Sequence, residues 1–172
     1  MPKRRRRVLL RRERNALWAF AGAANPHARA VSTEWIIRRF ETRDSEAVVA
    51  LWQACGLTRP QNDPRKDIAR KLKVNPEWFL VAEQRGAIVG SVMAGYEGHR
   101  GWINYLGVAP ALQRGGLGRR LMDEAETRLR AAGCPKINLQ VRPDNKAAIA
   151  FYERIGFAVE GAVSLGKRLE RD

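Results

Sequence analysis

The sequence predicts a single α/β domain built on a mixed β-sheet, and three observations support this class. The chain has 172 residues, which is enough for one domain with a sizeable core. Its hydrophobic content of 45% and charged content of 29% are ordinary for a soluble globular protein. From residue 35 onward, strand-like and helical segments alternate in the order β-α-α-β-β-β-α-β-α-β-β. We therefore expect a sheet of about six to seven strands flanked by four helices.

The expected strands are rich in β-branched and aromatic residues and are bounded by turn-forming residues. Asn138 and Gln140 alternate with apolar neighbours, so their strand has one polar face. In chain order the strands cover residues 35–40, 78–83, 87–96, 102–108, 137–141, 157–163 and 164–169.

The expected helices are identified by their caps and by apolar side chains that recur every three or four positions. Asp63 followed by Pro64 is a cap with a proline at the first helical position. The third helix is the clearest, with an apolar stripe on one face and Gly133 just after its end. In chain order the helices cover residues 42–55, 64–74, 117–132 and 145–155.

Composition excludes several classes of protein. No apolar run approaches the ~20 residues that span a bilayer, so no membrane contact is expected. The two cysteines, Cys55 and Cys134, form neither a disulfide framework nor a metal-ligand cluster. With only two histidines in the chain, we expect no bound metal, and we expect a cytoplasmic protein.

Residues 1–34 are predicted to be a basic extension, and residues 35–172 the folded domain. Residues 1–30 hold nine of the 32 basic residues and one of the 18 acidic residues. Three interpretations stay open: an arm that neutralises nucleic-acid phosphates, a secretory signal, and a disordered extension. We favour the extension, because nothing in this stretch can pack into a core. Nucleic acid is then not an expected partner, and Val31 would mark the natural start.

The stretch from Gln113 to Gly118, QRGGLG, is the most informative in the chain. Three glycines at a strand-to-helix corner expose backbone N–H groups, and a helix N-terminus carries a partial positive charge. The expected guest is therefore an anion, most often a phosphate. The spacing differs from the G-x-G-x-x-G dinucleotide fingerprint. Arg119 follows the last glycine, where a nucleotide-triphosphate loop needs a lysine.

A second motif, downstream of this loop, indicates which family of proteins the loop resembles. Residues 145–157 read N-x-x-A-x-x-F-Y-x-x-x-G-F, and the loop before them reads Q-x-x-G-x-G. Together, in this order and at this spacing, they resemble the acetyl-CoA loop and the later helix motif of the GNAT acyltransferases, a superfamily of N-acetyltransferases. The resemblance covers about residues 35–169, and it implies a GNAT-type domain.

The resemblance implies acetyl-CoA as the co-substrate. The strand carrying Leu106, Gly107 and Val108 would hydrogen-bond the pantetheine arm, and Asn145 would reach the same arm. Gln113 is the first residue of the loop that would hold the pyrophosphate. The backbone N–H groups that would bind it belong to Arg114, Gly115, Gly116, Leu117, Gly118 and Arg119.

The resemblance also implies direct attack of a primary amine on the thioester in a ternary complex. Tyr152 is the candidate general acid, because a phenol with a pKa near ~10 can protonate a leaving thiolate of pKa ~8.5. Glu97, His99 and a chain of water molecules stay open as the general base. Both cysteines are interpreted as structural rather than nucleophilic.

The amine acceptor is not identified by the sequence. In the family the acceptor pocket is built from loops that correspond here to residues 57–63, 96–101 and 160–167. Arg59, Arg100 and Arg142 could bind an acid group on a small amine, while protein amines stay open. A homodimer is expected by analogy alone. The alternative function is a non-catalytic acyl-CoA-binding module, because the central strand lacks the glutamate that some family members place there.

Overall fold

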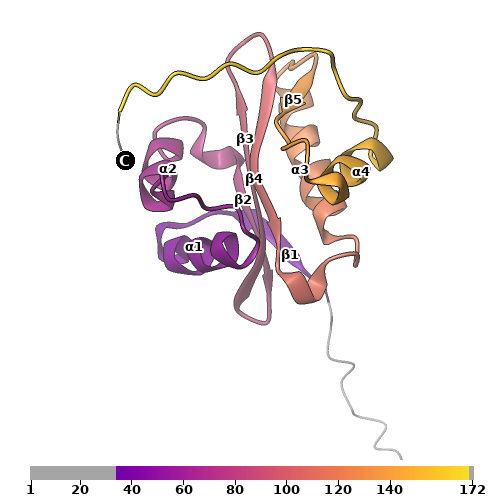
Figure 1. Ribbon diagram of the computed structural model, residues 1–172. Helices are drawn as coiled ribbons and strands as arrows, with labels where there is room; N and C mark the ends of the chain where they lie inside the picture. The colour runs from indigo at the N-terminus through magenta and orange to yellow at the C-terminus, as the bar shows by residue number, and fades with distance from the viewer. Residues whose placement is uncertain (1–33, 171–172) are drawn as a thin grey trace, which may run out of the picture. The chain divides into compact units, whose positions relative to one another are not determined.

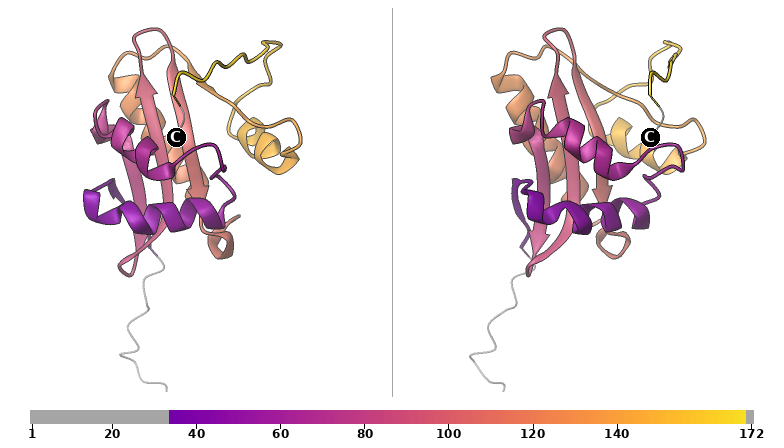
Figure 2. Two further views of the ribbon diagram at one scale, coloured as in Figure 1. Left: turned by 60° about the vertical axis from the view of Figure 1, so that its left-hand side comes forward. Right: turned by 90° about the vertical axis from the view of Figure 1, so that its left-hand side faces the viewer.

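The structure, a computed structural model, describes residues 34–170, so the expectations for residues 1–33 and for Val31 lie outside the described residues. One five-stranded sheet has the order β1-β2-β3-β4-β5. Helices α1 and α2 cover one face of this sheet, and α3 and α4 cover the other (Figure 1). Figure 2 shows α1 and α2 side by side on their face.

The strands are antiparallel from β1 to β4, and β5 runs parallel to β4, so the predicted mixed α/β class is confirmed. No helix among residues 34–170 combines the length and the apolar character that a bilayer-spanning helix needs. The strands are β1 Ile36–Arg39, β2 Phe79–Gln84, β3 Ala87–Tyr96, β4 Gly101–Val108 and β5 Ile137–Leu139. The helices are α1 Ser45–Ala54, α2 Pro64–Lys71, α3 Leu117–Ala131 and α4 Lys146–Arg154.

Each face of the sheet has its own hydrophobic core. On the α3 face, the apolar stripe predicted from the sequence is fully buried against β2, β3 and β4, and α4 packs beside it. On the other face, Trp52 of α1 and Ile68 of α2 pack on Phe79 and its strand neighbours. The buried stripe of α3 consists of Leu117, Leu121, Met122, Ala125 and Leu129.

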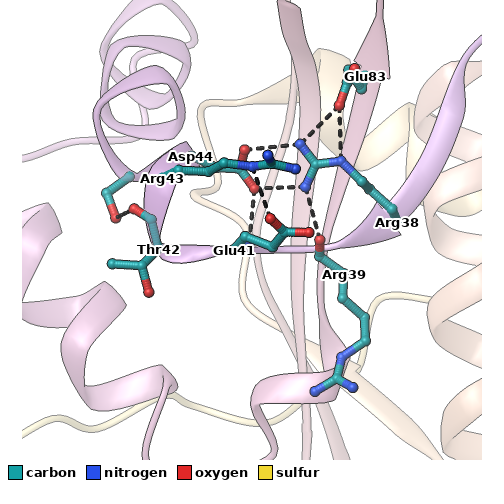
Figure 3. A network of polar contacts seen from close by, with 8 residues as sticks. Arg38, Arg39, Glu41, Thr42, Arg43, Asp44 and Glu83 are labelled. Atoms are coloured by element: carbon teal, nitrogen blue, oxygen red, sulfur yellow. Dashed lines mark hydrogen bonds and ion pairs between the residues drawn. The ribbon is translucent and has the colours of Figure 1, made fainter. Parts of the chain in front are cut away.

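The corner between β1 and α1 is held by a charged network centred on Arg38 (Figure 3). The Arg38 guanidinium donates to both carboxylate oxygens of Asp44, at 2.7 and 2.9 Å, and to Glu83 of β2 at 2.9 Å. Asp44 also accepts the backbone N–H of Glu41 at 2.8 Å. The side-chain hydrogen bond from Arg38 holds the pKa of Asp44 below its usual range. This network fixes the entry of the chain into α1.

The prediction of two strands at residues 157–163 and 164–169 is wrong. No strand is present between α4 and Glu170, so the sheet has five strands rather than six to seven. Apolar side chains of this segment, such as Val163 and Leu165, are 84% and 91% exposed. Without a buried face to stabilise it, this segment has no compensation for the entropy of ordering a strand. It crosses instead from α4 to the α2 side of the sheet (Figure 1).

Candidate functional site

The N-terminus of α3 forms a corner that has the backbone geometry of an anion-binding site. Gly116 is the N-cap, with φ of +88°, and no side chain caps this helix end. The first helical hydrogen bond runs from the N–H of Arg120 to the carbonyl of Gly116, so the preceding N–H groups lack intrahelical partners. Arg114 also has a left-handed φ, +64°. This geometry turns successive N–H groups toward one side, as an anion requires.

Two aromatic residues pack against this corner. Trp35 lies 3.8 Å from the position of a Cβ on Gly115, and the Arg120 guanidinium sits over the Trp35 ring, 5.9 Å from its centroid. Across the corner, the Phe151 ring of α4 is 3.4 Å from the position of a Cβ on Gly118. These contacts fix the loop between the start of β1 and α4.

The strand leading to this corner offers a free edge. Strand β3 pairs with β4 up to Val108, whereas β5 pairs only with Gly101, Trp102 and Ile103. Among the described residues, the β5-side edge of residues 106–108 therefore has no strand partner. An extended ligand can add to such an edge as a further strand. Leu106, Gly107 and Val108, which the sequence proposed for this role, all lie on it.

A bulge shapes this edge. Asn104 pairs with Met93 and Gly107 with Ser91, so Tyr105 and Leu106 stand opposite a single residue of β3. Tyr105 adopts a left-handed φ of +51° there. Leu106 contributes to the core on the α3 face, while Tyr105 packs on the α1 face.

Buried hydrogen bonds support the bulge from the α1 side. The Ser91 hydroxyl accepts the indole N–H of Trp52 at 2.8 Å and donates to the carbonyl of Tyr105 at 3.1 Å. The Tyr105 ring stacks on Trp52 with centroids 3.9 Å apart, and its hydroxyl donates to Asp67 of α2 at 2.6 Å. The sequence interpretation missed Asp67, because an aspartate in an amphipathic helix gives no signal of its own.

Tyr152, the candidate general acid, lies on α4 and packs against the core on the α3 face of the sheet. Its ring packs edge-on against Phe151 and Phe157, and it lines a groove of about 1250 Å³ with residues of β5 and the segment after α4. Burial raises the pKa of Tyr152 to about 12. The phenol therefore keeps its proton throughout the physiological range and can donate a hydrogen bond there.

The two residues proposed as bases lie far from the free edge. Glu97 and His99 belong to the hairpin before β4, roughly 20 Å along the strand from Leu106. The Glu97 carboxylate accepts the N–H groups of His99 and Arg100 at 2.6 and 2.7 Å, which lowers its pKa. A carboxylate stabilised in this way is a poorer proton acceptor. The geometry therefore favours neither residue as the base.

Three further residues that the sequence singled out, Gln113, Asn145 and Cys55, have structural partners. The Asn145 side chain caps α4 by accepting the N–H of Ala148 at 3.1 Å. Gln113 donates to the carbonyl of Val108 at 3.1 Å and so ties the loop to the end of β4. Cys55 donates to the same carbonyl, and burial raises the pKa of its thiol, as befits a structural cysteine. Within residues 34–170, no three metal-ligating side chains cluster.

Comparison with known proteins identifies the family of this chain. The model of the acetyltransferase (GNAT) family matches residues 34–157. An acetyltransferase of Yersinia enterocolitica is 52% identical over 133 residues, which are 77% of this chain and 94% of the relative. An acetyltransferase of Pectobacterium atrosepticum is 52% identical over 136 residues, 79% of this chain and 96% of the relative.

Solved structures agree with this assignment. The ribosomal-protein-S18-alanine N-acetyltransferase of Escherichia coli is 26% identical, with a TM-score of 0.61 over 72% of this chain and 77% of that one. The enzyme AAC(6')-Iy, solved with the bisubstrate analogue CoA-S-monomethyl-acetylneamine, shares the fold at 17% identity, with a TM-score of 0.66 over 79% and 99%. The fold and these relatives thus define a GNAT-type acetyltransferase. The chain belongs to the GNAT acetyltransferase family.

Proposed function

We propose that this protein transfers the acetyl group of acetyl-CoA to a primary amine by direct attack in a ternary complex. The observation that carries the proposal is the continuity of the anion-binding corner of α3 with the free edge of β4. A ligand with phosphates at one end and an extended arm at the other fits both at once. Pantetheine pyrophosphate has this form.

Each part of the site has a role in the proposed reaction. Backbone N–H groups at residues 114–119 bind the pyrophosphate, and the edge at residues 106–108 binds the arm. A backbone N–H at the bulge stabilises the charge that develops on the thioester oxygen. Tyr152 donates its proton toward the leaving sulfur. The amine loses its proton to water, because Glu97 and His99 lie at the other end of β4.

A thiol-release assay with acetyl-CoA and a panel of small amines, polyamines and peptides tests the proposal. Release that depends on an amine supports it, and mass spectrometry of the acetylated product identifies the acceptor. Tight coenzyme A binding without release for any acceptor would favour a non-catalytic acyl-CoA-binding module instead.

A further inference from the structure

The peptide group that joins Tyr105 to Leu106, inside the β4 bulge, is fixed from its carbonyl side. The Tyr105 carbonyl accepts the hydroxyl of Ser91 at 3.1 Å, and Ser91 is fully buried in β3. In a trans peptide the N–H and the carbonyl point in opposite directions, so the Leu106 N–H points away from Ser91. Neither β3 nor β5 pairs with Leu106 among the described residues, which leaves this N–H to a ligand at the free edge.

The proton of the Ser91 hydroxyl is directed to this peptide by Trp52. The indole N–H of Trp52 donates to the Ser91 oxygen at 2.8 Å, and an indole N–H can only donate. The Ser91 proton therefore cannot point at Trp52 and goes to the Tyr105 carbonyl. The resulting chain of hydrogen bonds runs in one direction, from Trp52 through Ser91 to the peptide. Both side chains are 0% exposed, and in such an interior each donor polarises the next group.

The Tyr105 side chain holds the bulge in place beside this chain of hydrogen bonds. Its ring stacks on Trp52 with centroids 3.9 Å apart, and its hydroxyl donates to Asp67 at 2.6 Å. These contacts, with the bond from Ser91, offset the strain of a left-handed φ of +51° in a residue other than glycine. Without the bond from Ser91, the peptide is free to rotate, and its N–H then leaves the direction of the edge.

We infer that Ser91 is a positioning residue for acetyl transfer: its hydroxyl, oriented by Trp52, directs and polarises the Leu106 N–H toward the thioester oxygen. The inference rests on the proposed function, because an acetyl-CoA arm along residues 106–108 brings its thioester carbonyl to this N–H. A peptide carbonyl that accepts a hydrogen bond makes the N–H of the same peptide a stronger donor. Negative charge grows on the thioester oxygen during attack, so this donor stabilises the transition state more than bound acetyl-CoA.

Calorimetry with acetyl-CoA and with coenzyme A separates this role from a general structural one, because only acetyl-CoA carries the thioester oxygen. Ser91→Ala is expected to lower the affinity for acetyl-CoA ~5-fold and to leave the affinity for coenzyme A unchanged. With an amine that supports thiol release, kcat is expected to fall at least ~10-fold.

Two variants serve as matched controls. Val92→Ala truncates the next residue of β3, which is equally buried but faces the core on the α3 side. It is expected to lower stability in urea unfolding while the preference for acetyl-CoA over coenzyme A and kcat stay unchanged. Ser91→Thr keeps the hydroxyl and is expected to keep the preference, although its extra methyl group lowers stability.

The outcomes separate this inference from the proposed function. Loss of the preference in S91A, with the preference retained in V92A and S91T, supports the inference. Equal loss of both affinities in S91A, the same loss of preference in V92A, or an S91A protein with unchanged preference and kcat would overturn it and leave acetyl transfer intact. Wild-type protein that binds both ligands but releases no thiol with any amine would refute acetyl transfer, and the affinity ratios would still decide whether Ser91 orients the Leu106 N–H.

Discussion

Replacing Tyr152 with phenylalanine removes the phenol of the proposed general acid and keeps the ring that packs against Phe151 and Phe157. Turnover is expected to fall at least ~10-fold, because general acid catalysis typically contributes ~10²–10⁴-fold. Coenzyme A affinity is expected to change little, since the phosphate and pantetheine contacts come from other residues. Tyr96→Phe removes a phenol at the β3–β4 hairpin and serves as the control, with turnover unchanged.

The burial of this phenol also predicts a pH-dependent stability. The folded state raises the pKa of Tyr152 to about 12, whereas an unfolded tyrosine titrates near ~10. The folded chain therefore holds this proton more tightly, so the stabilisation is complete below pH ~10 and is lost as the pH rises toward 12. The total is about 3 kcal/mol, of which about 1.4 kcal/mol is lost by pH 11.

Urea unfolding of the wild type and Y152F at pH 7, 9 and 11 measures this contribution. The stability difference between the two proteins is expected to shift by about 1.4 kcal/mol in favour of Y152F between pH 9 and pH 11. A difference that stays constant with pH would refute the burial argument. Unchanged turnover in Y152F would remove Tyr152 from the proton transfer.

Three further substitutions test residues that hold the start of α3, the β4 bulge and the β1–α1 corner in place. Gly116→Ala places a side chain at φ of +88° and is expected to cost about 1 kcal/mol in urea unfolding, whereas Gly161→Ala, without a left-handed φ, costs little. Ser91→Ala leaves the buried indole N–H of Trp52 without its acceptor and is expected to cost about 2 kcal/mol and to weaken acetyl-CoA binding through the bulge. Asp44→Asn is expected to cost about 2 kcal/mol at pH 7. The folded state depresses the pKa of Asp44, so the wild type is more stable than this variant only while the carboxylate is ionised. The difference in unfolding free energy is therefore expected to decline as the pH falls below ~4 and through the folded pKa. Urea unfolding of both proteins between pH 3 and pH 7 measures this decline.

Local chemistry made most elements predictable. Helix α2 begins at Pro64 as predicted, and the Asp63 side chain caps it by accepting the N–H of Arg65. Gly133 follows the end of α3 as predicted and has a left-handed φ. Strand β3 has the bounds expected from its turn residues. These features depend on neighbours within a few positions, which a sequence displays directly.

Long-range features were not predictable in the same way. The contact between Tyr105 and Asp67 joins residues 38 positions apart, and the bulge that permits it depends on Ser91 in another strand. The strands expected after α4 are absent for a long-range reason as well, because the apolar side chains of this segment find no surface to bury them. Glu97 was proposed as a general base because of its place in the loop before β4. Its carboxylate instead accepts two backbone N–H groups of the same turn, those of His99 and Arg100.

The central claim is that the α3 corner and the β4 edge form one acetyl-CoA site. Backbone amide NMR of the ¹⁵N-labelled protein, titrated with coenzyme A, tests it most directly. The account predicts the largest shifts at residues 114–119 and 104–108, with the hairpin at residues 97–100 unaffected. Saturable binding whose shifts avoid both segments would contradict it.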